Sequence, residues 1–419
     1  MFFRNPQLTL LFCSLFLIMI GFGIVIPLLP FVARELGATS MDMGLLVTAW
    51  AAAQFIIAPR WGTFSDRVGR RPTIILGLVG FGFSFILMGL STHLWVLYVA
   101  RILGGLMSAA TMPSASAYIA DVTTREERGA SMGLLGAAFG LGFMLGPTIG
   151  GLLAPLGVRF TFFIAGTCGW LNAILVYFML PEPETRSKSG ARGQSALHAV
   201  VASLKKPYAI LLFIPFCMSF AGSVLFSMMA YYLMDKFAAN ESLVAIAFAV
   251  NGGIGVLTQG FLLGAALKLM NELHLLRIGM LVTALGFAGF LVSPSFFFIL
   301  VCVALVSMGQ GLARPVVMTL LSKATDMGQG VTMGLQSSYE SLGRVAGPLW
   351  AGFVYMLSIE APYASSALIY ILTMFILERA RRLLNEVAEE DARLAAMAPP
   401  VPQKILAAPG PMGDGSAKN

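Results

Sequence analysis

The sequence predicts an all-α membrane protein with twelve transmembrane helices in two pseudo-symmetric six-helix bundles. The first observation is composition. Of the 419 residues, 58% are hydrophobic and 11% are charged, whereas a soluble domain carries about 25% charged residues. The second is an internal repeat. Gly129–Leu152 and Gly330–Phe353 share nine identities in 24 positions at an offset of 201 residues, as a duplicated unit would.

The expected spans are apolar runs separated by short polar connections, each long enough to cross a bilayer. The first six are Leu8–Pro30, Met43–Pro59, Thr73–Leu90, Leu94–Ala120, Gly129–Pro155 and Phe160–Leu180. The second six are Tyr208–Leu233, Leu243–Leu267, Leu275–Leu291, Ser295–Leu320, Gly330–Leu357 and Tyr363–Leu377. Pro27 and Pro30 predict a bend in the first span, because proline removes a backbone hydrogen-bond donor.

A basic, proline-bounded segment interrupts this pattern near the midpoint of the chain. We therefore expect residues 181–207 to be a cytoplasmic linker between an N-terminal bundle, residues 1–180, and a C-terminal bundle, residues 208–380. Residues 378–397 can form an amphipathic helix. Because Pro, Gly and Ala dominate beyond Pro399, we expect residues 381–419 to be a largely disordered cytoplasmic tail.

The positions of Lys and Arg predict that both termini are cytoplasmic. With the N-terminus inside, most of the 27 Lys and Arg residues fall on inner connections, as the positive-inside rule requires. Three fall on the outer side (Arg34, Arg159 and Lys236) and three lie well within spans (Arg101, Arg314 and Arg344), while Arg277 lies at the inner edge of its span. The net charge of +7 is thus a topology signal, and we expect no nucleic-acid partner.

Cysteine and histidine usage argues against a metal site. The four cysteines lie in apolar runs with no paired spacing, and the three histidines fall outside the predicted spans. The cysteines are therefore interpreted as small packing residues. We expect no metal and no cofactor.

The connection after the second span carries a cluster of glycines and charges. Its residues are Gly62, Asp66, Arg67, Gly69, Arg70 and Arg71. Glycine permits close approach and tight turns, Asp66 can face the positive end of a helix, and Arg70 can pair with an acid on another span. The cluster resembles the G-x-x-x-D-R-x-G-R-R loop of the major facilitator superfamily. The resemblance implies a gating latch in which Asp66 caps the eleventh helix near Gly330 in one state and Arg70 pairs with Asp121.

A glycine face marks the fifth span. It comprises Gly142, Gly146, Pro147, Gly150 and Gly151. Glycines spaced four apart let a partner backbone come close, and Pro147 bends the helix. The motif resembles that of drug:proton antiporters in the same superfamily, which implies export, while helix packing alone remains the alternative interpretation. The likeness runs from Leu8 to about Leu377 and is to twelve-helix multidrug and quinolone efflux pumps, with tetracycline pumps next.

The charged residues well inside the predicted spans are Glu340, Arg101, Arg314 and Arg344. A charge at the bilayer centre costs about 2.5–3.5 kcal/mol, so each must face a cavity, pair or serve function. Glu340 and Arg344 are i, i+4 and share a helix face, and Arg314 can reach toward Glu340. Two interpretations stay open: a proton-exchanging or substrate-binding acid, with Arg101 also linked to coupling by resemblance, and a static ion pair that locates the eleventh helix.

We expect an apolar, adaptable cavity at the midplane between the bundles, because Met and Phe side chains fit many ligands. Its candidate residues are Gln54, Phe226, Met229, Asn251, Gln310, Gln336 and Tyr339. The excess of arginine over carboxylate in the spans favours ligands with an anionic group, zwitterions included. The chain has Phe226 and Gly311 where the quinolone pumps carry acids, so the proton-carrying residues of those pumps are not transferred.

The sequence therefore predicts a proton-coupled secondary transporter, not an enzyme, that exports amphipathic drugs or similar compounds by alternating access. The proton gradient is its expected energy source. The alternative is a specific exporter of a metabolite or lipid-linked sugar on the same fold. The expected partners are a small-molecule substrate, protons and the lipid bilayer of the cell membrane, with the chain acting as a monomer.

Overall fold

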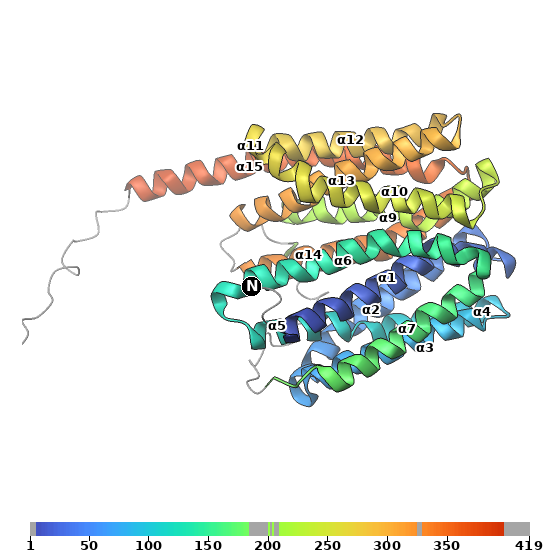
Figure 1. The fold of residues 1–419 in the computed structure, drawn as a ribbon. Coiled ribbons are helices and arrows are strands. Elements are labelled where there is room, and N and C mark those ends of the chain that lie inside the picture. Colours follow the sequence, from blue (N-terminus) through green and yellow to red (C-terminus); the bar gives the residue numbers. More distant parts are fainter. Residues whose placement is uncertain (1–5, 184–199, 202, 205–208, 325–328, 398–419) are drawn as a thin grey trace, which may run out of the picture. The chain divides into compact units, whose positions relative to one another are not determined.

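The computed structural model describes residues 6–183, 200–201, 203–204, 209–324 and 329–397. It divides into two compact units, Met1–Leu377 and Glu378–Asn419, and the first unit holds all the predicted spans. The regular elements of the described residues are helices. In the first unit they run side by side along one common direction (Figure 1).

The helices reproduce the predicted spans in order. The first half holds α1 (Pro6–Glu35), α2 (Ser40–Val68), α3 (Arg70–Gly89), α4 (Leu94–Ser108), α5 (Thr111–Val122), α6 (Arg125–Leu153), η2 (Ala154–Leu156) and α7 (Val158–Met179). The second half holds α9 (Ala209–Phe237), α10 (Glu241–Leu257), η3 (Thr258–Leu262), α11 (Leu263–Leu269), α12 (Glu272–Val292), α13 (Phe296–Ala324), α14 (Gln329–Tyr355) and α15 (Ala361–Met397). The fourth span is divided into α4 and α5, and a π-helical turn, η3, interrupts the eighth.

Much of the predicted linker, residues 184–199, 202 and 205–208, lies outside the described residues, as do residues 398–419 of the predicted tail. Residues 378–397 form the last part of α15, as the amphipathic pattern predicts.

Polar caps mark the starts of several helices. Thr39 and Asp42 form a capping box at the start of α2. Asn240 accepts from the backbone N–H of Leu243 at the start of α10, and Asn271 caps α12 in the same way. Each cap satisfies backbone donors that the first turn leaves free, which is worth about 1 kcal/mol.

The second helix is longer than the sequence predicts. The predicted span ends at Pro59 and is followed by a loop, whereas α2 continues to Val68. The turn is confined to Gly69, whose φ of +130° favours glycine. Pro59 lies inside the helix without ending it, because other groups in a membrane protein can satisfy the carbonyl that a proline leaves free.

Glycine faces hold corresponding helix pairs together in the two halves. A Cβ on Gly146 of α6 would lie 2.6 Å from the Cα atom of Gly23 in α1. At the repeat-equivalent position, a Cβ on Gly347 of α14 would lie 2.3 Å from the carbonyl oxygen of Phe220 in α9. Gly142 and Gly150 pack on α1 in the same manner. The bare face that the sequence predicted is therefore used for close packing.

The same repeat places glycines where the halves meet. A Cβ on Gly151 would lie 2.3 Å from the Cβ of Ala245 in α10, and one on its equivalent, Gly352, would lie 2.6 Å from the carbonyl oxygen of Ser40 in α2. The contact pairs α6–α10 and α14–α2 are thus related by the internal duplication, which supports two pseudo-symmetric bundles.

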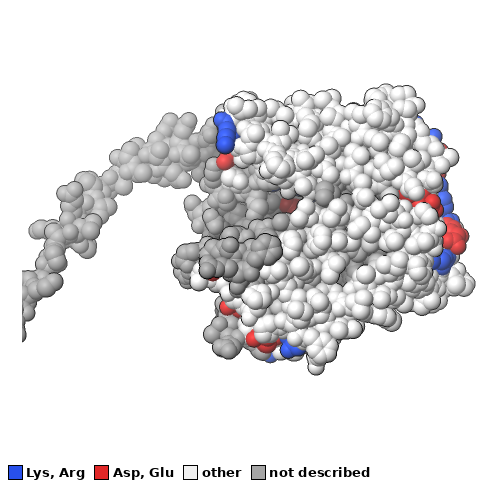
Figure 2. Space-filling view, viewed as in Figure 1, with Lys and Arg blue, Asp and Glu red and all other residues white. Residues whose placement is uncertain are grey.

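Ten helices among the described residues are long and apolar enough to cross a membrane. The two repeat copies form α6, of 29 residues, and α14, of 27 residues. Figure 2 shows one face of the molecule as uncharged along most of its length, with Lys, Arg, Asp and Glu gathered near its two ends. A belt of this kind matches a lipid-facing surface bounded by water.

We call the end of the bundle that carries Gly69 the loop end, and the end that carries Arg34 the sealed end. At the sealed end the halves touch directly. Arg34 of α1 pairs with Asp235 of α9 at 2.5 Å. Tyr231 donates to the carbonyl oxygen of Ala38 at 3.2 Å, and Thr48 of α2 donates to the carbonyl oxygen of Val345 in α14 at 2.9 Å.

Candidate functional site

A cavity of about 1080 Å³ lies between the two halves. Its walls are mostly apolar, with Phe22, Trp50 and Phe226 among them. It extends to Gly62 and Asp66 near the loop end, whereas the halves are in contact at the sealed end. A volume of this size accommodates a drug-sized molecule.

Polar side chains from both halves face this cavity. They include Gln54, Asn251, Gln310, Arg101, Arg314 and Arg344. Of the predicted cavity residues, Gln54, Phe226, Asn251 and Gln310 therefore line it.

Three of the predicted cavity residues lie elsewhere. Met229 is fully buried, with 0% of its surface exposed, on the packed side of α9. Tyr339 is buried and shares a 2.9 Å hydrogen bond with Ser203. Gln336 faces a small side pocket beside Glu340. Composition identified the helices correctly. Which side chains of a helix face the cavity depends on how the helix is rotated about its axis, and packing against neighbouring helices sets that rotation.

Arg101 is held against an aromatic ring in the cavity wall. Its guanidinium carbon lies 4.7 Å from the centre of the Trp50 ring, and its Nε donates to the carbonyl oxygen of Leu46 at 3.1 Å. A cation over an indole face is attracted by the ring quadrupole. Among the described residues no carboxylate forms an ion pair with Arg101. Nothing in the sequence pattern pointed to Trp50, because it lies on another helix.

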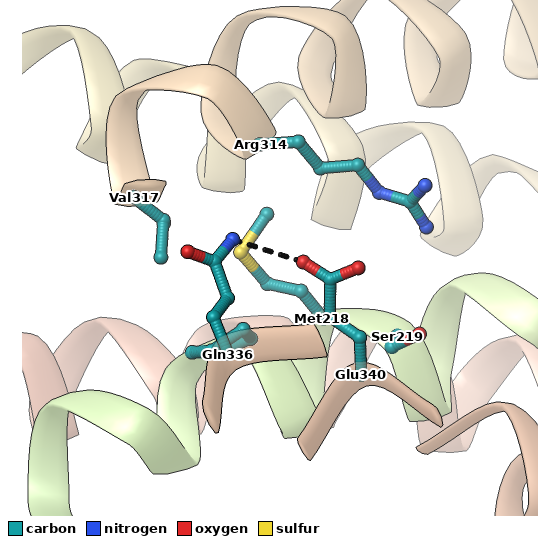
Figure 3. Close-up of a pocket in the computed structure, with 7 residues that line it drawn as sticks. Met218, Ser219, Arg314, Val317, Gln336 and Glu340 are labelled. Atoms are coloured by element: carbon teal, nitrogen blue, oxygen red, sulfur yellow. Dashed lines mark hydrogen bonds between the residues drawn. The ribbon is translucent and has the colours of Figure 1, made fainter. Parts of the chain in front are cut away.

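Glu340 lies in a side pocket next to the cavity. Its Oε1 accepts from Nε2 of Gln336 at 3.0 Å, and its Oε2 lies 3.5 Å from a guanidinium nitrogen of Arg344. Its side chain is 26% exposed, so the carboxylate is neither sealed in packing nor fully solvated. Figure 3 shows Arg314 reaching from α13 over the Glu340 carboxylate. The expected approach of Arg314, Glu340 and Arg344 is thus present.

The loop-end cluster centres on Arg70. Its guanidinium pairs with Asp121 of α5 at 3.0 Å and with Asp66 one helical turn earlier. The Arg70–Asp121 pair is the one that the resemblance implied. In this structure Asp66 faces Arg70 and the cavity, and the surroundings of Gly330 lie outside the described side chains.

Glu182 caps this cluster and was not predicted from the sequence. It follows α7 and accepts from the backbone N–H of Arg70 at 2.7 Å and of Arg71 at 2.9 Å. Carboxylates are favoured at a helix N-terminus, so Glu182 occupies the start of α3. Arg71 also lies over the ring of Tyr177, 5.0 Å from its centre, and Arg67 is exposed at the end of α2.

The sealed-end pair was missed as well, although the sequence carries a signal for it. Arg34 and Asp235 are separated by 201 residues, which is the offset of the internal repeat. They are equivalent positions of the two halves, and equivalent positions can meet only beside the axis that relates the halves. Opposite charges at repeat-equivalent positions therefore indicate a pair across that axis.

A metal site is not indicated by the described residues, which hold no group of three or more His, Cys, Asp or Glu side chains able to bind one. The chemistry of the site is thus that of an apolar chamber with arginines in its wall, the Asp66 carboxylate near its loop end and the Glu340 carboxylate in a side pocket.

Comparisons with known proteins agree with this architecture. The family model described as the Major Facilitator Superfamily matches residues 11–271 and 211–412. Multidrug resistance protein 1 of Bacillus subtilis (strain 168) is 34% identical over 366 residues, which cover 86% of this chain and 92% of that protein. Quinolone resistance protein NorA of Staphylococcus aureus is 30% identical over 359 residues, which cover 85% and 92%.

Solved structures share the fold. A bacterial homologue of the human lysosomal transporter Spinster, in an inward-facing and unoccupied conformation, has a TM-score of 0.70 at 17% identity, covering 91% of this chain and 96% of that one. A POT family transporter has a TM-score of 0.74 at 13% identity, covering 90% and 96%. With matching halves, a chamber between them and these likenesses, the chain belongs to the Major Facilitator Superfamily and is a multi-pass membrane transporter, not an enzyme.

Proposed function

We propose that this transporter exports amphipathic organic compounds, drugs among them, in exchange for protons. The names of its relatives, which are multidrug and quinolone resistance proteins, support drug export. The large apolar chamber supports it independently, because an adaptable apolar wall accepts many ligands.

The position of Glu340 is the observation that carries proton coupling. Its carboxylate lies in a side pocket whose wall includes Arg314, and Arg314 also lines the main cavity. A substrate in the cavity and a proton on Glu340 therefore act on the same arginine. This arrangement couples two binding events without requiring substrate to touch the carboxylate.

The coupling follows from charge. When Arg314 and Arg344 face Glu340, the ionised carboxylate is stabilised. A substrate with an anionic group draws the arginines toward the cavity, which leaves Glu340 with less positive charge nearby and favours its protonation. Protonation in turn frees the arginines to hold the substrate. The arginine-lined wall favours anionic and zwitterionic substrates for the same reason.

The distribution of Lys and Arg supports an orientation in which the loop end faces the cytoplasm. The cavity of this structure then opens inward, which suits loading of an export substrate. One proton entering across about 100 mV supplies about 2.3 kcal/mol. At about 1.4 kcal/mol per tenfold ratio, this supports a roughly fortyfold substrate gradient.

Glu340→Gln tests the coupling. Everted membrane vesicles energised by a proton gradient are incubated with the fluorescent quinolone norfloxacin in the medium, with and without an uncoupler, and its uptake into the vesicles is measured. We expect the unaltered protein to show uncoupler-sensitive transport. In Glu340→Gln the rate of that transport should fall at least about tenfold, because the amide cannot exchange a proton.

Glu241→Gln, at the first turn of α10, is the matched control and should transport normally. Gradient-driven transport by Glu340→Gln at the normal rate would exclude the role of Glu340. Failure of the unaltered protein to move either norfloxacin or ethidium would favour a specific exporter instead.

A further inference from the structure

A small cavity beside Glu340 is distinct from the large chamber. Its volume is about 10 Å³, which is close to what a single water requires. Ser219 of α9, Gln336 and Glu340 of α14 and Arg314 of α13 form its polar wall, as Figure 3 shows.

Two polar atoms in this wall are buried without a hydrogen-bond partner. They are Oγ of Ser219 and Oε1 of Gln336. Ser219 is 3% exposed and Gln336 is 8% exposed. Buried polar groups in native proteins are almost always hydrogen-bonded to protein or to ordered water, so both atoms indicate a missing partner.

The orientation of the Gln336 amide is set by its neighbour. Its Nε2 donates to the Glu340 carboxylate at 3.0 Å, and a flipped amide would place two acceptors against each other. Oε1 must therefore accept from something else. A water can accept from the Ser219 hydroxyl and donate to the Glu340 carboxylate, whereas Oε1 of Gln336 points away from Ser219, toward Val317, in Figure 3.

A metal cation would satisfy the same oxygens but is disfavoured by charge. Arg344 lies 3.5 Å from Glu340, and Arg314 forms another part of the wall. Two guanidinium groups beside one carboxylate repel a further cation. Water is the ligand that fits both the volume and the charge.

We propose that this cavity holds one ordered water and that Ser219 links it to the export chamber, so that Ser219, the water and Glu340 form a proton relay. Ser219 lines both cavities. A hydronium ion in the chamber gives its proton to Ser219 Oγ as the serine hydroxyl proton passes to the relay water. That water passes one of its protons to Glu340. The hydronium becomes water, Glu340 becomes neutral, and the serine and relay water are regenerated.

The relay rests on the proposed function, because it assumes that Glu340 exchanges protons. Ser219 itself accepts and gives up a proton in this scheme, and Ser219→Ala tests the relay in full-length protein reconstituted into liposomes. Two rates are measured with norfloxacin: transport driven by a pH gradient, and exchange of internal for external norfloxacin at equal pH. Exchange involves no net proton movement.

Ser227→Ala is the matched control. Ser227 lies on the same helix and is fully buried, but its hydroxyl donates to the carbonyl oxygen of Ser223 at 3.0 Å. The Ser227→Ala substitution therefore removes a serine hydroxyl from the same helix at a position that lines neither cavity. Glu340→Gln is measured in parallel.

We expect Ser219→Ala to slow gradient-driven transport about tenfold, with a larger solvent deuterium isotope effect, and to leave exchange unchanged, while Ser227→Ala changes neither rate. Unchanged gradient-driven transport in Ser219→Ala, with Glu340→Gln uncoupled, would overturn the relay and leave the proposed function standing. An equal loss of both rates would also overturn it, since it would mark a structural defect. Normal gradient-driven transport in Glu340→Gln would instead overturn the proposed function.

Discussion

At the scale of single residues, glycine decides how closely the helices approach. Gly146 and Gly23 bring α6 and α1 into backbone contact, and a Cβ on Gly146 would lie only 2.6 Å from the Cα atom of Gly23, so that one helix would have to shift. Other helix glycines, such as Gly253 in α10, have no atom within 4 Å of an added Cβ. Glycine is therefore required at some positions and only tolerated at others.

We expect Gly146→Ala to destabilise the protein by about 1–3 kcal/mol, because overpacking a close contact forces the backbone to shift. Thermal unfolding in detergent measures the effect. Gly253→Ala is the matched control and should unfold at the same or a slightly higher temperature, since alanine is the better helix former by about 1 kcal/mol. Equal behaviour of the two variants would show that the α1–α6 contact is looser than described.

Glu360 provides a residue-scale test of pH dependence. It lies between α14 and α15 and accepts from Ser358 at 2.7 Å and from Lys236 at 3.3 Å. Burial alone would raise the pKa of Glu360, but the hydrogen bonds from Ser358 and Lys236 outweigh burial and lower that pKa. A lowered folded pKa means that the ionised form stabilises the fold above the unfolded pKa, and that this contribution is lost as pH falls through the folded value.

We therefore expect Glu360→Gln to cost less than about 1 kcal/mol at neutral pH, as for a partly exposed ion pair. The difference should disappear as the pH falls below about 4.3, the ordinary glutamate value. Melting temperatures at neutral and acidic pH check this. In a Lys236→Met background, the stability cost of Glu360→Gln at neutral pH should be smaller. A cost that grew as the pH fell would contradict a lowered pKa for Glu360.

At the scale of elements, the repeat places equivalent helices against each other at the sealed end. α1 and α9 meet through Arg34 and Asp235, and the Asp235 carboxylate also accepts from Tyr355 of α14 at 2.6 Å. Alternating access requires this end to open. The pair is a contact that must break during the cycle, whereas Arg159–Glu35, at 3.1 Å, lies within one half and can persist.

Asp235→Asn should favour opening of the sealed end. Because the pair is partly exposed, its loss is worth up to about 1 kcal/mol, or up to roughly fivefold in the population of the open form. Maleimide labelling of Ser40→Cys, with the exposed Cys13 and Cys168 replaced by serine, measures this opening.

Labelling should be roughly twofold to fivefold faster in Asp235→Asn. Glu35→Gln removes an ion pair at the same end that does not cross between the halves, so its labelling should match the parent. Equal acceleration of labelling by both substitutions would mean that the Arg34–Asp235 pair does not specifically hold the sealed end closed.

At the scale of the whole molecule, the charge pattern predicts that the loop end is cytoplasmic. Arg60, Arg67, Arg70 and Arg71 lie at that end, and basic residues beside short connections set orientation. Green fluorescent protein fused after Met397 should therefore fluoresce, and alkaline phosphatase fused after Gly37, between α1 and α2, should be active in bacterial cells. The reverse pattern would invert the proposed direction of transport.

Several features of this transporter are predictable from its sequence because they are local. The spans follow from apolar length, the close face of α6 from glycines four residues apart, and the Glu340–Arg344 pair from i, i+4 spacing. The Arg70–Asp121 contact followed from resemblance. Met229 lies outside the cavity of this structure, and an almost wholly apolar helix such as α9 carries no periodicity to say which of its faces turns inward. Tyr339, on α14, instead bonds to Ser203, a partner that is 136 residues away in the sequence.

The sequence by itself determined the fold class, the duplication and the presence of one carboxylate among arginines in the spans. Only the tertiary structure decided that Glu340 lies in a side pocket, that Trp50 supports Arg101, that Glu182 caps α3 and that Arg34 meets Asp235. The physical reason is distance along the chain. Helix formation and spacing depend on neighbours within a few residues, whereas these contacts depend on how packed helices are rotated against partners far away in sequence.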